Sequence, residues 1–184
     1  MSRIGRQPIE IIAGVSATIE RERVIIRGPK GEVTVPIHSH VSVAMDGGHL
    51  TVTVVRPNAK EDKALWGLTA RLLQNAVIGV TRGYERQLEV QGVGYRVEIK
   101  GNSLMFVLGY SHPVIFELPA GIAATIEKNI ITLRGIDKQI IGEAAARIRL
   151  LRKPDAYHGK GIRYVGEIIR LKPGKAAKSG AAAK

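Results

Sequence analysis

The chain has 184 residues, of which 45% are hydrophobic and 24% charged, so it can bury a core, and a wholly disordered chain is excluded. It has no cysteine, which excludes disulfides and thiolate metal sites, and its net charge of +12 predicts a polyanionic partner such as nucleic acid or an anionic membrane. The N-terminus shows no secretory signal and no run of about 18 apolar residues occurs, so we expect a cytoplasmic protein that does not span a membrane.

Short runs of alternating polarity, typical of half-buried strands, fill the first part of the chain. They cover residues 15–19, 23–27, 32–35, 41–43 and 50–54, with turns at 28–31 and 46–48. The period then changes, because Leu65, Leu68 and Leu72 recur at helical spacing between residues 59 and 81. We expect Asn58 to cap this helix, with Glu61 as its capping-box partner.

The second part of the chain repeats this order. Strands are expected over residues 88–99, 104–108, 114–118 and 130–133, then a helix over about 137–152 and a further strand over 165–171. The pattern predicts an α+β protein with two tandem similar domains from an internal duplication, each a mostly antiparallel β-sheet packed against one α-helix. The alternative is two α+β halves that merely look alike. The expected domains are 1–82 and 83–171, and a basic tail, 172–184, should be flexible alone.

The positive charge is concentrated near the C-terminus. From Arg147 onward the chain holds 11 basic and two acidic residues, so this last fifth carries most of the net charge. Gly159 and Gly161 flank Lys160, and glycine lets a backbone approach a phosphate closely. Together with basic and tyrosine side chains that can bind phosphates and stack on bases, this predicts RNA binding by Lys153, Tyr157, Lys160, Arg163 and Tyr164. The alternative is an ordinary glycine-rich turn with solvated charges.

Other motifs give weaker signals. Lys160 is followed by Gly161 rather than Ser or Thr, so the segment is not a P-loop. Residues 92–97 lack the third glycine of a dinucleotide fingerprint and are expected to form a bent strand, in which glycine allows another backbone to come close. Within the turn at 109–113, Ser111 and His112 either have a structural role or present donors to RNA.

No catalytic or metal site is indicated. His38 and His40 would share one face of a strand, but no third ligand is identifiable, so we expect no metal and no cofactor. No pair of carboxylates is placed for acid–base work, and no Ser-His-Asp arrangement is indicated, so an enzyme is not predicted. A peripheral membrane role is also disfavoured, because the basic tail lacks bulky apolar anchors.

Several segments together resemble the bacterial L-six (universal L-six) family of large-subunit ribosomal proteins. The resemblance covers nearly the whole chain and is carried by residues 2–9, 28–31, 92–96, 109–113 and 154–162. The last segment reads Pro-Asp-Ala-Tyr-His-Gly-Lys-Gly-Ile, where the family signature is similar to Pro-acid-x-Tyr-Lys-Gly-Lys-Gly-aliphatic. His158 therefore stands where the family usually has a lysine.

This resemblance implies a structural role in the large ribosomal subunit, with 23S rRNA bound mainly by the C-terminal domain. It implies a position near the factor-binding side and the sarcin–ricin region, with stalk-base proteins and translation GTPase factors as further partners. The implied RNA anchor runs from Lys153 to Lys175 and adds the residues His158, Gly159, Gly161, Arg170, Lys172 and Lys175. The first rival is a nucleic-acid-binding protein that acts outside the ribosome, and the second is an enzyme acting on a phosphorylated substrate.

Overall fold

The structure is a computed structural model in which residues 2–174 are described. The chain forms two compact units. The N-terminal unit contains the residues up to Tyr84 together with Gly135–Lys138, and the C-terminal unit contains Glu85–Arg134 and the chain from Gln139 onward. The division after Tyr84 lies beside the boundary expected at Gly83. The short segment Gly135–Lys138 groups with the first unit because Ile136 packs against its core.

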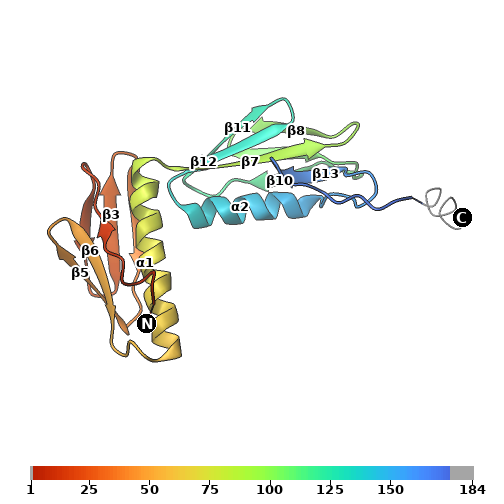
Figure 1. Cartoon of the computed structure of the whole chain (residues 1–184). Helices are drawn as coiled ribbons and strands as arrows, with labels where there is room; N and C mark the ends of the chain where they lie inside the picture. The colour runs from red at the N-terminus through yellow and green to blue at the C-terminus, as the bar shows by residue number, and fades with distance from the viewer. Residues whose placement is uncertain (1, 175–184) are drawn as a thin grey trace, which may run out of the picture. The chain divides into compact units, whose positions relative to one another are not determined.

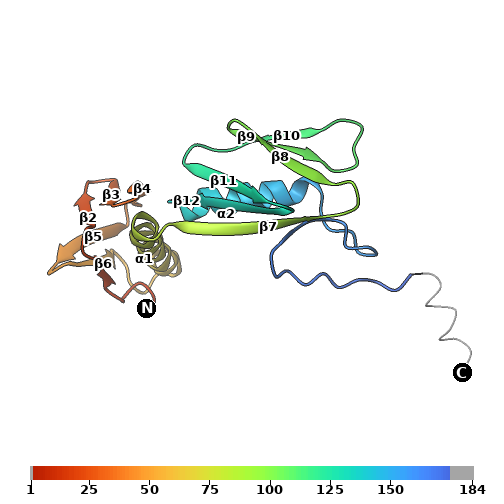
Figure 2. The ribbon, with the colours of Figure 1, turned by 90° about the horizontal axis from the view of Figure 1, so that it is seen from above.

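Six strands and one long helix make up the N-terminal unit (Figure 1). One antiparallel sheet has the order β2-β3-β4 and the other the order β1-β6-β5, and α1 packs on both (Figure 2). The bounds are β1 (Ile9–Glu10), β2 (Ser16–Ile19), β3 (Arg23–Gly28), β4 (Gly31–Pro36), β5 (Val41–Asp46), β6 (His49–Val54) and α1 (Lys60–Thr81).

The core of this unit follows from the two periods seen in the sequence. On β3, Val24 and Ile26 are fully buried, while Ile25 between them is only half-buried and the flanking Arg23 and Arg27 are exposed, as the twofold strand period requires. On α1 the buried residues include Trp66, Leu73 and Val80, one helical stripe. The Trp66 indole N–H donates to the carbonyl oxygen of Val52 at 2.7 Å, which satisfies its one donor inside the core.

The predicted cap of α1 is wrong. The N-cap is Ala59, with extended backbone angles and no side-chain hydrogen bond. The polar group at this end is instead the fully buried carboxylate of Asp62, which accepts the backbone N–H of Arg56 at 3.0 Å. A carboxylate in the first turn is also favoured by the helix dipole.

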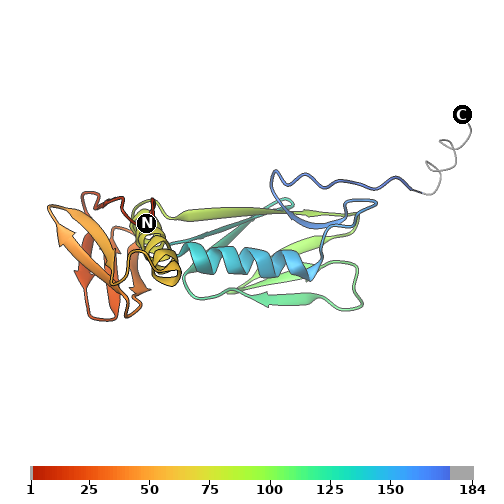
Figure 3. The ribbon, with the colours of Figure 1, turned by 60° about the horizontal axis from the view of Figure 1, so that its bottom comes forward.

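In its described part, the C-terminal unit has two sheets and one helix. The strands are β7 (Tyr84–Gln91), which begins at the boundary between the units, β8 (Arg96–Lys100), β9 (Ser103–Val107), β10 (Val114–Glu117), β11 (Ile122–Glu127), β12 (Ile130–Gly135) and β13 (Gly161–Tyr164), and the helix is α2 (Lys138–Leu151). The sheet orders are β11-β12-β7-β13 and β10-β9-β8. Helix α2 runs along one face of this strand layer (Figure 3), and Ile141, Ala145 and Ile148 are buried on its inner side.

Two predicted strand boundaries differ in this unit. Residues 88–99 are interrupted by a turn, so β7 and β8 enter different sheets. A side chain on Gly92 would meet the ring of Tyr95 at 2.7 Å, so the close neighbour is a tyrosine ring rather than the expected backbone. The last strand is β13, not residues 165–171, because pairing with β7 buries Ile162 whereas Ile168 stays 90% exposed.

The predicted fold class is confirmed: both units are α+β, with a single helix packed on antiparallel strands in each described part. The strands of each unit hydrogen-bond as two sheets rather than one. Within residues 2–174, no helix is long and apolar enough to cross a membrane.

Candidate nucleic-acid interface

The loop between α2 and β13 carries most of the predicted RNA-binding residues, and its own backbone closes it. The amide of Asp155 donates to the carbonyl oxygen of Lys160 at 2.9 Å, and the amide of Gly159 donates to that of Asp155 at 2.9 Å. The carboxylate of Asp155 accepts the backbone N–H of His158 at 2.9 Å and lies 3.0 Å from its ring Nδ1. These contacts, led by the His158 backbone N–H, hold the pKa of Asp155 below its usual value.

The two glycines of this loop have a structural role in the closed loop. Gly159 and Gly161 are buried, with φ of +70° and +148°. A Cβ on Gly161 would lie 2.7 Å from the carbonyl oxygen of Lys153 and 2.7 Å from Cα of Pro154. The backbone that comes close to Gly161 is thus that of its own loop. Glycine is needed here so that the loop can fold back on the end of α2.

Three arginines of the basic segment already have acidic partners. Arg163 lies opposite Glu89 in the β13–β7 register and donates to its Oε2 through Nε at 3.0 Å and Nη2 at 2.9 Å. Arg149 binds Glu167 through two nitrogens and stacks on the Tyr164 ring, 6.0 Å from its centroid. Arg147 pairs with Glu143 one turn earlier on α2. These pairs neutralise part of the charge that the sequence count assigned to RNA.

The other cations of this segment point to solvent. Lys153, Lys160, Arg170 and Lys172 are exposed, and none of them has an acidic partner within residues 2–174. Tyr157 is also exposed on the same loop, while Tyr164 is half-buried beside Arg149. Lys175 lies outside the described residues. We use the name loop cations for Lys153, Lys160, Arg170 and Lys172 together with Arg152.

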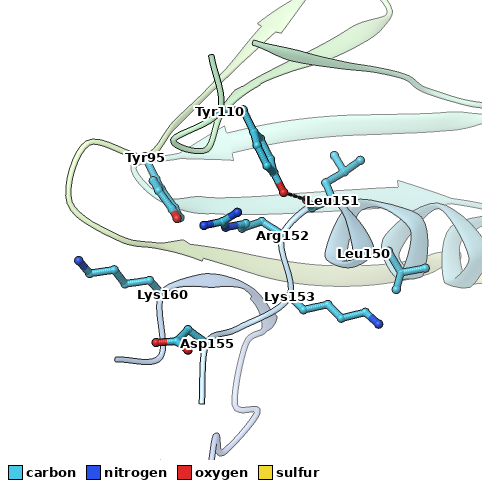
Figure 4. A pocket seen from close by; sticks show the side chains of 8 residues that line it. All are labelled: Tyr95, Tyr110, Leu150, Leu151, Arg152, Lys153, Asp155 and Lys160. Atoms are coloured by element: carbon cyan, nitrogen blue, oxygen red, sulfur yellow. Dashed lines mark hydrogen bonds between the residues drawn. The ribbon is translucent and has the colours of Figure 1, made fainter. Parts of the chain in front are cut away.

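A hollow beside the loop contains residues that the sequence analysis did not select. It has a volume of about 520 Å³ and is lined by Tyr95, Tyr110, Leu150, Leu151, Arg152, Lys153, Asp155 and Lys160. Figure 4 shows the Arg152 guanidinium between the hydroxyl ends of the two tyrosines. It lies over the Tyr110 ring, 5.0 Å from the centroid. Contacts with the hydroxyls of Tyr110 and Tyr95 raise the pKa of Arg152.

The sequence contained a partial signal for this hollow. Tyr95 belongs to the glycine-bearing segment predicted as a bent strand, and Tyr110 to the turn predicted at 109–113. Nothing in the sequence shows that these two segments meet at the end of α2. Ser111 and His112 follow Tyr110 on the same turn and are exposed, with Ser111 Oγ 3.4 Å from His112 Nδ1. The structure therefore places them next to Tyr110, which lines the hollow.

His38 and His40 are not on a strand. They precede β5, with their rings edge to face and their centroids 5.1 Å apart. Nδ1 of His40 lies 3.0 Å from Oδ1 of the buried Asp62, and this contact is the largest cause that lowers the pKa of Asp62. Over the described residues, no group of three or more His, Cys, Asp or Glu side chains is arranged to hold a metal ion.

Comparison with known proteins gives matches along nearly the whole chain. The family model described as Ribosomal protein L6 matches twice, over residues 11–83 and 91–165. The protein named "Large ribosomal subunit protein uL6" of Nautilia profundicola is 48% identical over 178 residues, covering 97% of this chain and 99% of the relative. The protein of the same name from Deinococcus deserti is 47% identical over 182 residues, covering 98% and 97%. The double match fits the internal duplication predicted from the sequence.

Proposed function

The chain belongs to the Ribosomal protein L6 family, and from that premise we propose that it is a structural part of the large ribosomal subunit. It binds 23S rRNA mainly through the C-terminal unit, using the loop cations. The family is one of ribosomal proteins rather than of enzymes. The observation that carries the proposal is the separation of the basic residues into arginines paired with glutamates and exposed cations without an acidic partner, which lie on the α2–β13 loop and on the segment after β13.

Phosphate contacts supply most of the affinity in this proposal. Lys153 and Lys160 stand on a loop whose backbone is closed by its own hydrogen bonds, so they meet the RNA from a fixed base. Exposed Tyr157 is available to stack on a base or ribose. Arg170 and Lys172 extend the charge along the segment that follows β13, and Lys175 continues it. RNA of defined shape is recognised by such backbone contacts more than by base reading.

The wider setting belongs to the same proposal and is supported by the family resemblance alone. The chain acts in the cytoplasm, within the ribosome, near the factor-binding side and the sarcin–ricin region. Its neighbours are proteins of the stalk base, and translation GTPase factors are transient partners. Cross-linking of intact large subunits, followed by identification of the linked peptides and nucleotides, tests this position directly. Links confined to another face of the subunit would contradict it.

A salt titration tests the RNA-binding role. The full chain is bound to fragments of 23S rRNA and, for comparison, of 16S rRNA, with the double variant Lys153→Gln/Lys160→Gln beside it. If each lysine contacts one phosphate, the slope of log K against log salt falls by about 0.9 for each lysine lost. The matched control is Lys60→Gln/Lys100→Gln, which removes two exposed lysines elsewhere and should leave the slope unchanged.

Two outcomes would contradict the proposal. Equal binding to both RNAs by every variant would mean that the basic loop is only a general polyanion surface. Failure of the full chain to sediment with large subunits in high salt would favour a nucleic-acid-binding protein that acts outside the ribosome. Truncation after Lys153 is a poor test, because it removes β13 and with it the buried Ile162.

A further inference from the structure

Arg152 lines the hollow, and its guanidinium is held in one orientation. We propose that this hollow binds a single backbone phosphate of the RNA, with the Arg152 guanidinium as the oriented ligand and the Lys160 ammonium as the second cation. The inference rests on the proposed function, since it names the group of the RNA that the C-terminal unit holds at this place. None of Tyr95, Tyr110 and Arg152 was selected from the sequence.

Two tyrosines orient Arg152. The Tyr110 hydroxyl donates its proton to the carbonyl oxygen of Leu151 at 2.9 Å, so its oxygen lone pairs are left for the guanidinium. The Tyr95 ring is itself held between Gly92 and Gly109, where a Cβ on either glycine would lie within 2.7 Å and 3.4 Å of ring atoms. A guanidinium fixed by such contacts loses less side-chain freedom when it binds an anion.

Arg152 keeps donors for a ligand. A guanidinium has five N–H groups, which is more than two neighbouring phenol oxygens can engage. Within residues 2–174 no carboxylate pairs with Arg152, in contrast to Arg149 and Arg163. The remaining N–H groups match the two oxygens of a phosphodiester. Tyr95 adds a hydroxyl group beside the guanidinium (Figure 4), and a phenol hydroxyl can donate a hydrogen bond to a phosphate oxygen.

The lining of the hollow favours an anion at the Arg152 end. The hollow has room for one nucleotide unit, and Arg152, Lys153 and Lys160 line it against one carboxylate, Asp155. That carboxylate is bound by His158, and like-charge repulsion would keep a phosphate away from it and next to the tyrosines. In Figure 4 the Lys160 side chain lies on the Tyr95 side of the hollow and Lys153 extends on the opposite side, and both ammonium groups are turned away from Arg152.

The test replaces the planar guanidinium of Arg152, which can bind two phosphate oxygens at once, with an ammonium group of the same charge. Arg152→Lys should weaken binding of the full chain to its 23S rRNA fragment about tenfold at fixed salt, because the oriented bidentate contact is lost. The slope of log K against log salt should stay the same, because the charge is retained. Tyr95→Phe should weaken binding about threefold. The matched control, Arg147→Lys on α2, should bind like the wild type, because Arg147 does not line the hollow and the substitution keeps its charge.

Phosphate ethylation gives a second readout that a purely structural role of Arg152 would not change. Ethylation of one particular RNA phosphate should weaken binding by the wild type more than binding by Arg152→Lys, because the lysine keeps the charge contact but not the oriented bidentate one. If Arg152→Lys binds like the wild type with the same interference pattern, the inference is overturned and the proposed function stands. If the wild type does not select 23S rRNA fragments, both are overturned.

The same variants separate RNA from other anions. Inorganic phosphate at constant ionic strength should raise the melting temperature of the wild type by no more than it raises that of Arg152→Lys. If it raises that of the wild type more while RNA binding is the same for both proteins, the hollow is a site for a free anion and the proposal fails. A preference of the hollow for an acidic peptide over the RNA fragment, lost in Arg152→Lys, would also overturn it.

Discussion

The basic residues of the C-terminal unit fall into two groups with different physical roles. Arg149 and Arg163 lie beside a carboxylate, with about a quarter of each side chain exposed, and Arg147 has an acidic partner on its own helix. The loop cations lack acidic partners in the described chain and face solvent or the hollow. The comparison teaches that net charge overstates an RNA footprint, because an arginine opposite a glutamate stabilises the fold and offers little to a phosphate.

The largest effect on the loop is expected from Gly161→Ala. The new Cβ would lie 2.7 Å from two backbone atoms of the Lys153–Pro154 segment, at a φ of +148° that alanine avoids. We expect a loss of about 3 kcal/mol in the free energy of unfolding, measured by urea denaturation. The control is Gly159→Ala, where the nearest atom is 3.6 Å away and only the φ of +70° is unfavourable, so the loss should be about 1 kcal/mol. Equal losses would mean that the loop does not depend on this close approach.

Arg163→Gln tests whether an arginine paired with a glutamate stabilises the fold or binds RNA. The side chain loses its contacts with Glu89, and the carboxylate keeps its charge on a half-buried strand face. We expect the free energy of unfolding to fall by about 1.5 kcal/mol. The salt slope of RNA binding should stay unchanged, whereas the phosphate contact that the sequence predicts for Arg163 would make its loss lower the slope by about 0.9. A lower slope with unchanged stability would instead put Arg163 among the phosphate-binding residues.

How well the sequence predicts a feature of this molecule depends on how far apart in the chain the residues that form it lie. The helices were predicted to within about a residue at each end, because hydrophobic period is local. The Asn58 cap failed, since Asp62 binds the neighbouring backbone instead. The Arg163–Glu89 pair and the Tyr95–Arg152–Tyr110 hollow depend on strand register and on turns that meet only in the fold. Such contacts join residues far apart in the chain, and composition cannot reveal them.

The Arg149–Glu167 pair predicts a dependence of stability on pH. The hydrogen bonds from Arg149 hold the pKa of Glu167 below its ordinary value of 4.5. A carboxylate with a lowered folded pKa contributes stability that is fully present above the unfolded pKa and is lost as the pH falls through the folded value. Below about pH 4.5, the wild type should therefore lose stability more steeply than Glu167→Gln. The difference between the two urea-denaturation curves across pH 3 to 6 isolates this group from Asp62, Glu85 and Asp155, whose pKa values are also lowered.

The smallest effect is expected from Arg147→Gln, and it tests whether pairing alone withholds an arginine from RNA. Arg147 and Glu143 lie one helical turn apart, and both side chains are more than 60% exposed. Such a pair stabilises a helix by only about 0.3 kcal/mol, so unfolding should change by no more than that. An RNA phosphate competes easily for an arginine held this weakly. An unchanged salt slope would therefore show that the face of α2 bearing Arg147 lies away from the RNA, whereas a slope lower by about 0.9 would extend the RNA interface from the loop onto the helix.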